Sequence, residues 1–216
     1  MKAIVILSGG MDSTVMLYHL KQTYECFAVS FDYGQRHRKE LIFARVTCAK
    51  LNIPHKVVDL SSITQLLGGS ALTDNIEVPE GHYADENMKS TVVPNRNMIM
   101  LSLAVGYAVS IGAENVAYAA HSGDHQIYPD CRLEFVQKLT EVTKIANYQP
   151  VWILAPFIHM NKGQIAKLGV ELGVDFALTW TCYKGLRRPC GKCGACRERQ
   201  EAFQFAGVPD PGENND

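Results

Sequence analysis

A short stretch near the N-terminus, Ser8-Gly9-Gly10-Met11-Asp12-Ser13, has residue types that could bind a phosphate group. Its glycines permit positive φ and let the backbone approach a ligand closely. The helix that follows presents free N–H groups, and Ser8, Ser13 and Thr14 add hydroxyl donors. The Asp12 carboxylate would repel phosphate unless a divalent cation lay between them, so we interpret it as a magnesium ligand. The alternative is an ordinary strand-to-helix turn with Asp12 as the N-cap.

The same loop excludes two common kinds of nucleotide site. It lacks the Gly-Lys-Ser/Thr sequence of the P-loop, which delivers a γ-phosphoryl group. It also lacks G-x-G-x-x-G, so a dinucleotide is not favoured. We therefore interpret it as a nucleotide-phosphate loop of a different kind.

Four of the seven cysteines lie in the last 35 residues. These are Cys182, Cys190, Cys193 and Cys196. The spacing predicts a closed, structural zinc site with four thiolates, which would fix the C-terminal segment on the sheet. An iron–sulfur cluster is the alternative, because it suits the same spacing. Cys26 and Cys48 fall within a predicted strand and helix and are expected to be core thiols, whereas Cys131 lies in a polar loop and is left open.

Polar residues also open two of the predicted helices. Asn95 and Asn97 could contact the edges of adenine, and Arg96 between them could pair with a phosphate or a carboxylate. Lys162 could neutralise departing pyrophosphate. The alternatives are a helix cap with a solvated arginine and, for Lys162, a solvated lysine.

Two loops after the fourth predicted strand contain further polar residues, His121-Ser122-Gly123-Asp124-His125 and Tyr128-Pro129-Asp130-Cys131-Arg132. Asp124 and Asp130 could accept hydrogen bonds from the ring N–H and exocyclic amine of a guanine-like base. The alternative is that both aspartates serve turn formation only.

The elements that must position these residues alternate along the chain. Strands are expected at 3–7, 26–31, 55–60, 115–121 and 151–155, and helices at 12–21, 38–51, 97–112, 133–147 and 162–172. This alternation predicts right-handed crossovers and a doubly wound α/β fold with a mainly parallel five-stranded sheet. Ligands of such sheets bind beyond the carboxyl ends of the strands, where the motifs above are found.

The expected organisation is an α/β domain over residues 1–178, a cysteine-bearing helical segment over 179–208 and a flexible acidic tail over 209–216. Residues 61–93 are polar and are expected to form a long loop of functional or mobile character.

Composition limits the function classes. With 47% hydrophobic and 20% charged residues the chain is an ordinary globular protein. A net charge of −1 gives no general indication of nucleic-acid or membrane binding. The N-terminal apolar run is too short for a signal peptide, and no run is long enough to span a membrane. A cytoplasmic, reducing location without disulfides is therefore expected.

Taken together, the motifs resemble one family closely. The hexapeptide from Ser8 resembles the signature of the N-type ATP pyrophosphatases, or PP-loop proteins, whose fold is the adenine nucleotide alpha hydrolase-like type. Further matching stretches narrow the resemblance to the QueC family of queuosine biosynthesis. These are residues 31–37, 94–97, 128–132 and 180–183, together with Cys190, Cys193 and Cys196. One departure is Thr181, where that family usually has serine.

The resemblance implies an ATP-dependent ligase that converts 7-carboxy-7-deazaguanine and ammonia to 7-cyano-7-deazaguanine, through an adenylate and an amide. It implies ATP, Mg²⁺ and one Zn²⁺ per subunit, and a homodimer. Asp124, Asp130 and Arg132 become candidates for contact with the deazaguanine.

Two other hypotheses stay open at this point. One is another PP-loop adenylating ligase or tRNA thiolation enzyme, for which Cys131 would be the reactive thiol. The other is a zinc-ribbon module that binds RNA, which the near-neutral charge disfavours.

Overall fold

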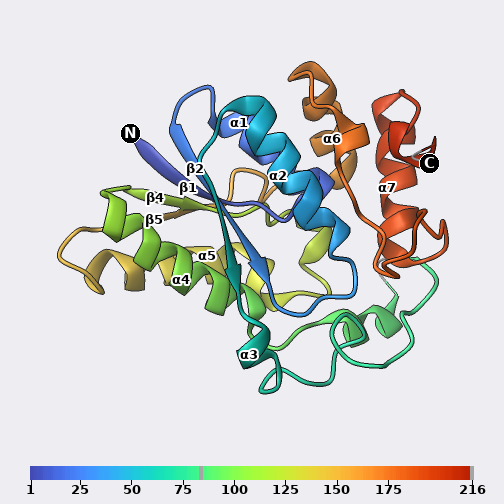
Figure 1. Cartoon of the computed structure of the whole chain (residues 1–216), viewed down its shortest axis with the longest axis horizontal. Helices are drawn as coiled ribbons and strands as arrows, with labels where there is room; N and C mark the ends of the chain where they lie inside the picture. The colour runs from blue at the N-terminus through green and yellow to red at the C-terminus, as the bar shows by residue number, and fades with distance from the viewer. Residues whose placement is uncertain (83–84, 215–216) are drawn as a thin grey trace.

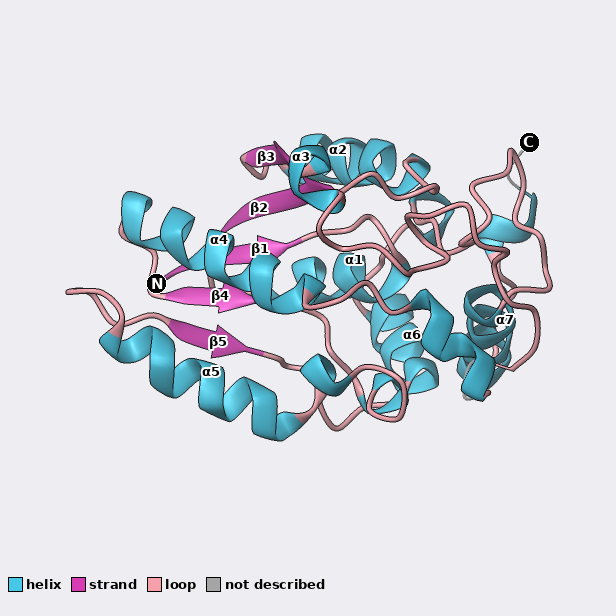
Figure 2. Cartoon of the chain, turned by 90° about the horizontal axis from the view of Figure 1, so that it is seen from below, coloured by secondary structure: helices cyan, strands magenta, loops and turns pink. Residues whose placement is uncertain are grey.

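The computed structural model describes residues 1–82 and 85–214. Residues 83–84 of the predicted long loop and 215–216 of the predicted tail lie outside them. Five parallel strands form one sheet in the order β3-β2-β1-β4-β5, and Figure 2 shows them side by side. The strands are β1 (Lys2–Ile6), β2 (Glu25–Asp32), β3 (His55–Asp59), β4 (Asn115–Ala117) and β5 (Trp152–Leu154). The doubly wound parallel sheet predicted from the sequence is confirmed.

Helices cover both faces of the sheet (Figure 1). The helices are α1 (Met11–Leu20), α2 (Lys39–Leu51), α3 (Ser61–Thr64), α4 (Arg96–Ile111), α5 (Leu133–Ile145), α6 (Lys162–Glu171) and α7 (Gly194–Ala206). Helices α1, α2, α6 and α7 pack on one face, and α4 and α5 pack on the other. None of the helices within the described residues is long and apolar enough to cross a membrane.

The alternation of side chains along β1 builds two cores. Ile4 is buried with Leu101 of α4 on one face, while the next residue, Val5, is buried with Val15 of α1 on the other. This is the period of two that a strand imposes, and it accounts for the unbroken apolar run of a strand covered on both sides. Helix α7 contributes Phe203 to the second core, so the C-terminal segment is packed directly on the α/β unit.

The sheet reverses direction between β1 and β4. The chain runs outward from β1 through β2 to β3, then returns to the other side of β1 to form β4 and β5. A doubly wound sheet leaves a crevice at such a switch point, beyond the carboxyl ends of the two strands. The loop after β1 and the loop after β4 therefore face each other.

Three predicted segments differ from the structure. Strand β4 ends at Ala117, four residues before the predicted end, because its neighbour β5 ends at Leu154, the residue opposite Ala117. The loop 61–93 contains the single turn α3 and a 3-10 helix over Glu86–Thr91. Asp210, in the expected tail, accepts two hydrogen bonds from Arg199 at 2.6 and 2.7 Å.

Candidate active site

A cavity of about 230 Å³ lies at the switch point. Its walls come from the loop after β1, the end of β2, the starts of α2, α4 and α6, the loop after β4 and the segment before the cysteines. Nine of the predicted site residues line it: Ser8, Gly10, Met11, Asp12, Ser13, Arg96, Asn97, Asp124 and Lys162. The tertiary structure thus brings together residues that are up to 154 positions apart in the sequence.

The remaining predicted residues do not line the cavity. Gly9 and the buried Thr14 belong to the loop but lie behind its surface. Asn95 is the exposed N-cap of α4, with a φ of 57°. Asp130 and the exposed Arg132 lie outside the lining, where the Arg132 Nε donates to the His125 carbonyl at 2.9 Å and so fixes that loop.

The phosphate loop is held by its own serines. The Ser8 backbone N–H donates to the Ser13 hydroxyl at 3.2 Å, and the two hydroxyls are 2.9 Å apart. The Gly10 N–H donates to the Ser8 hydroxyl at 3.0 Å. At its back, the Gly9 carbonyl accepts a hydrogen bond from the Trp180 N–H at 3.0 Å. These contacts keep the loop open at the N-terminus of α1, where backbone N–H groups favour an anion.

Asp12 has two oxygens in different situations. Oδ2 lies 3.2 Å from the Lys162 ammonium and 3.9 Å from His121 Nε2. Oδ1 is buried and has no hydrogen-bond partner among the described atoms. An orphaned carboxylate oxygen beside a phosphate loop is a suitable ligand for Mg²⁺, which usually binds one or two carboxylates together with substrate phosphates. The residues present therefore fit the predicted magnesium site.

Lys162 is buried between two carboxylates. Its ammonium lies 2.7 Å from Glu198 Oε2 on α7, in addition to its contact with Asp12. Burial opposes the charge on Lys162, but Asp12 and Glu198 outweigh burial and raise its pKa. The solvated lysine considered from the sequence alone is therefore wrong, and Lys162 carries a fixed positive charge at the phosphate loop.

A second polar group lies at the end of β2. The Arg96 guanidinium donates to the Tyr33 hydroxyl at 3.1 Å, and no carboxylate of the described residues forms an ion pair with it. Burial raises the pKa of Glu40 to about 8 and lowers the pKa of His37 to about 4. At neutral pH this part of the cavity is consequently positive, which favours an anionic group of a ligand.

Sequence reasoning missed Glu40, His37 and Glu198. Glu40 occurs in a helical pattern where a glutamate is usually solvated, and Glu198 stands in a run of charged residues. Only the stretch 31–37, through the resemblance, directed attention to the end of β2. The burial of these side chains depends on the packing of α2 against the phosphate loop and of α7 against α6, for which no local signal exists.

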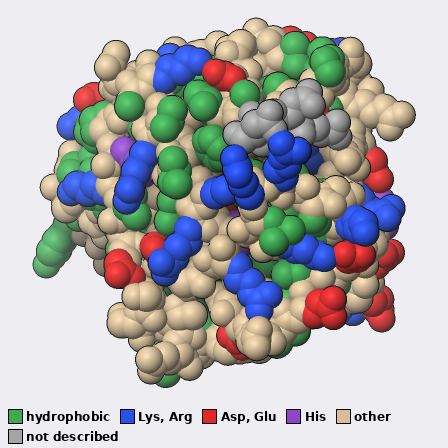
Figure 3. Space-filling model, turned by 45° about the vertical axis from the view of Figure 1, so that its right-hand side comes forward, with side chains coloured by type: hydrophobic (Ala, Val, Ile, Leu, Met, Phe, Trp, Pro, Cys, Tyr) green, Lys and Arg blue, Asp and Glu red, His purple; other side chains and the backbone are tan. Residues whose placement is uncertain are grey.

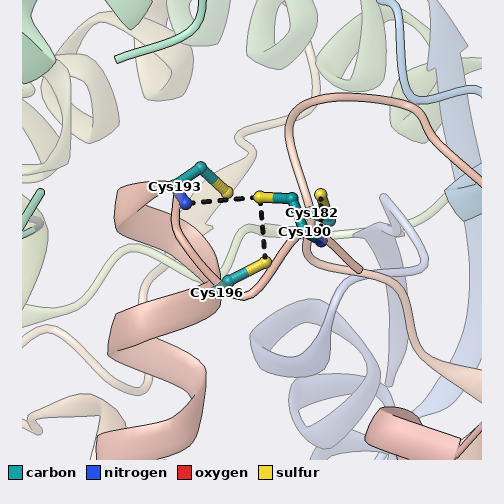
Figure 4. Close-up of side chains that lie close together, drawn as sticks. All are labelled: Cys182, Cys190, Cys193 and Cys196. Atoms are coloured by element: carbon teal, nitrogen blue, oxygen red, sulfur yellow. Dashed lines mark hydrogen bonds between the residues drawn. The ribbon is translucent and has the colours of Figure 1, made fainter. Parts of the chain in front are cut away.

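The four C-terminal cysteines converge on one point (Figure 4). Cys193 and Cys196 come from the start of α7 and Cys182 and Cys190 from the preceding segment, and all four sulfurs lie within 4.8 Å of one another. Four sulfurs bound to one zinc ion would lie about 3.8 Å apart. Hydrogen bonds from Cys193 and Cys196 lower the pKa of the Cys182 thiol, which favours the thiolate that a metal binds. The donor set fits a single metal ion.

The other three cysteines differ from this group. Burial raises the pKa of Cys26 to about 11 and of Cys48 to about 12, as expected of core thiols. Cys131 lines the cavity, but burial and the nearby carboxylates of Asp124 and Asp130 raise its pKa strongly. A thiol that stays protonated is a poor nucleophile, which disfavours the thiolation hypothesis.

The fold and the loop at its switch point define the PP-loop class of α/β protein. Solved structures that share the fold include a U34-tRNA thiolase NcsA from Methanococcus maripaludis with its 4Fe-4S cluster (TM-score 0.53, 18% identity, 94% of this chain and 64% of that chain). They also include an NH3-dependent NAD synthetase from Campylobacter jejuni subsp. jejuni NCTC 11168 (TM-score 0.50, 17% identity, 82% of this chain and 66% of that chain). At these identities the likeness concerns the fold alone.

Sequence comparison identifies the family within that class. The family model described as "Queuosine biosynthesis protein QueC" matches residues 2–207. A 7-cyano-7-deazaguanine synthase from Pseudoalteromonas translucida (strain TAC 125) is 59% identical over 213 residues, 98% of each chain. A 7-cyano-7-deazaguanine synthase 1 from Colwellia psychrerythraea (strain 34H / ATCC BAA-681) is 59% identical over 211 residues, 97% of each chain. The chain belongs to the QueC family.

Proposed function

We propose that this protein is a 7-cyano-7-deazaguanine synthase. The observation that carries the proposal is the 59% identity to a protein of that name over 98% of both chains. The cavity supports it, because the phosphate loop, the fixed charge of Lys162 and the Arg96 guanidinium all line the same cavity.

The chemistry requires that a carboxylate become an electrophile. The carboxylate oxygen of 7-carboxy-7-deazaguanine attacks the α-phosphorus of ATP, pyrophosphate leaves, and the acyl adenylate forms. The lone pair of ammonia then forms a C–N bond, and AMP leaves with the electron pair of the broken C–O bond while the nitrogen loses a proton. The resulting amide oxygen attacks the α-phosphorus of a second ATP and pyrophosphate leaves again. Loss of AMP with the electron pair of the C–O bond, and of two N–H protons, then gives the nitrile.

The phosphate loop from Ser8 to Thr14 is assigned to the β- and γ-phosphates of ATP. Asp12 would hold Mg²⁺ through Oδ1, and that ion would supply positive charge to the phosphates. Lys162 is assigned to the departing pyrophosphate, which its fixed charge stabilises. Asn97 lines the cavity and is assigned to the nucleotide together with Asn95, which shapes the start of α4.

Arg96 is assigned to the carboxylate of the substrate. It lines the cavity and forms no ion pair with a carboxylate of the described residues, and a planar guanidinium suits a carboxylate. Asp124 lines the same cavity and is assigned to the N–H groups of the deazaguanine. Asp130 and Arg132 are assigned to the shape of the loop that carries Asp124, because they lie outside the lining.

The four cysteines are assigned to one structural Zn²⁺, which would hold the segment 179–208 against the domain 1–178. Free ammonia is the proposed nitrogen source. We further propose a cytoplasmic homodimer, on the family resemblance alone.

The deciding experiment supplies the acid, ammonia and ATP and measures nitrile and pyrophosphate. Nitrile with pyrophosphate, and no pyrophosphate when the acid is omitted, is the expected result; release of phosphate without pyrophosphate would refute the mechanism. Arg96→Lys should raise the KM for the acid at least tenfold, because the bidentate contact is lost. Arg45→Lys, at an exposed arginine of α2 outside the cavity, is the matched control.

A second function, RNA binding by the cysteine segment, has one observation in its favour. Lys and Arg side chains gather across the face shown in Figure 3, which turns the α7 side of the molecule forward. Binding of tRNA that weakens steeply with salt would support this function, and binding that is absent at 50 mM salt would exclude it.

A further inference from the structure

Among the described residues, Lys162 is the only lysine in the cavity lining, and α1 and α7 both hold its ammonium. Asp12 of α1 contacts it at 3.2 Å and Glu198 of α7 at 2.7 Å. The side chains of Lys162, Asp12 and Glu198 are 9%, 20% and 12% exposed, so water screens these charges little. The closer of the two partners belongs to the helix that carries cysteines.

The backbone around Lys162 has a fixed position. Asn161 and Gln164 form a reciprocal capping box at the start of α6, with both hydrogen bonds at 2.9 Å. A Cβ on Gly163 would lie 2.6 Å from the Phe205 ring of α7, so the absence of a side chain there lets the two helices approach closely. Lys162 is thus presented to α7 and to the phosphate loop at once.

The position of Glu198 depends on the four-cysteine group. Helix α7 begins at Gly194 with Cys193 as its N-cap, and Glu198 follows Cys196 by two residues. The sulfurs of these cysteines lie within the four-cysteine group, so a metal ion there would fix the first turn of the helix. Any shift of this turn moves the carboxylate that binds Lys162.

The carboxylates of Asp12 and Glu198 are expected to respond differently when Mg–ATP binds. Asp12 is the residue with a free oxygen for Mg²⁺, and a metal ion on Asp12 weakens its attraction for Lys162. Glu198 lies outside the cavity lining and contacts Lys162 at 2.7 Å, so we expect this contact to persist when Mg²⁺ binds Asp12. Without Glu198, Lys162 would depend on Asp12 and Asp124 for neutralisation, and would compete more strongly with Mg²⁺ for Asp12.

We propose that Glu198 is a positioning residue that holds Lys162 at the phosphate loop and couples the four-cysteine segment to nucleotide binding. The inference rests on the proposed function only in taking Mg–ATP as the ligand. Glu198 lies outside the cavity lining and acts through Lys162.

The test measures the Kd of the Mg²⁺ complex of a non-hydrolysable ATP analogue by calorimetry, with thermal unfolding in parallel. Glu198→Gln keeps size and removes charge, and should raise the Kd about tenfold, as is typical for partners of ligand-binding groups. Glu201→Gln is the matched control, since Glu201 lies on the same helix with a side chain that is 57% exposed. It should change the Kd less than twofold.

A double variant separates positioning from a general structural effect. In a Lys162→Met background, Glu198→Gln should have no further effect on the Kd. A Kd within twofold of the unaltered protein for Glu198→Gln, or an equal loss with and without Lys162, would overturn the proposal.

If Glu198→Gln does not fold, Glu198→Asp replaces it, because the charge is kept while its distance from Lys162 changes. A rise in Kd beyond twofold then supports the proposal and a smaller one overturns it. The analogue needs no deazaguanine, so failure of nitrile synthesis would contradict the proposed function without affecting this result.

Discussion

Gly9 is the position at which a single methyl group should do most damage to the phosphate loop. Its φ is 89°, and a Cβ built there would lie 1.9 Å from the Glu40 carbonyl oxygen and 3.0 Å from the Ala44 nitrogen. Both atoms belong to the backbone of α2, which cannot move aside as a side chain can. Gly9→Ala must therefore displace the loop, the helix or both.

The cost has two parts. The left-handed conformation costs a residue with a Cβ about 1–2 kcal/mol. Overpacking against a fixed backbone adds about 1–3 kcal/mol. We expect Gly9→Ala to lower the free energy of unfolding by about 2–5 kcal/mol. The displaced loop should also weaken binding of the ATP analogue.

Gly112→Ala measures the cost of the left-handed conformation by itself. Gly112 ends α4 with a φ of 65°, and no other described atom lies within 4 Å of the position of its Cβ. It should cost only about 1–2 kcal/mol and leave nucleotide binding unchanged. Urea unfolding with unchanged m-values measures both variants. Equal destabilisation by the two substitutions would refute the argument that Gly9 is required by close approach of α2.

Three further predictions concern other buried groups. Because burial raises the pKa of Glu40 to about 8, the folded state binds the Glu40 proton more tightly than the unfolded state does, and the stability that this group contributes should fall as pH rises from about 4.5 to 8. Glu40→Gln should remove this pH dependence, which is about 1.4 kcal/mol for each pKa unit of the shift. Urea unfolding midpoints at pH 5 and pH 8 measure the difference. Cys193→Ser should lower the Tm more than Cys48→Ser, since both thiols are buried but only Cys193 belongs to the four-cysteine group. Equal Tm values for the two variants would contradict a stabilising metal ion at this group. Arg199→Gln should lower the free energy of unfolding, measured in urea, by about 3–5 kcal/mol, because it leaves the buried Asp210 carboxylate without its partner. Arg197→Gln, at an exposed site of the same helix, should lower it little. Similar losses for the two variants would show that the buried ion pair is unimportant.

Much of this site could be predicted from local pattern. The loop from Ser8 follows an apolar strand and precedes a helix, and the structure places it at the end of β1 as expected. The Cys190, Cys193 and Cys196 spacing brings three sulfurs together within one turn and the start of a helix, so it is visible in the sequence alone.

Other parts of the site have no local signal. Lys162 by itself is an ordinary lysine, and it becomes a fixed charge only because α6 packs on α7 and faces α1. Glu40 and His37 acquire their shifted pKa values from burial against the loop of another element. The predicted strand from Asn115 was too long, since its end depends on where β5 stops.

The sequence by itself determined the class of fold, the phosphate loop, the four-cysteine group and the family, because each depends on residue types at short spacing or on similarity along the whole chain. The tertiary structure alone decided which charges meet. Asp12, Lys162 and Glu198 come from three helices that are distant in sequence, and their ion pairs exist only because the switch point of the sheet and the close approach of α6 to α7 bring them together away from water.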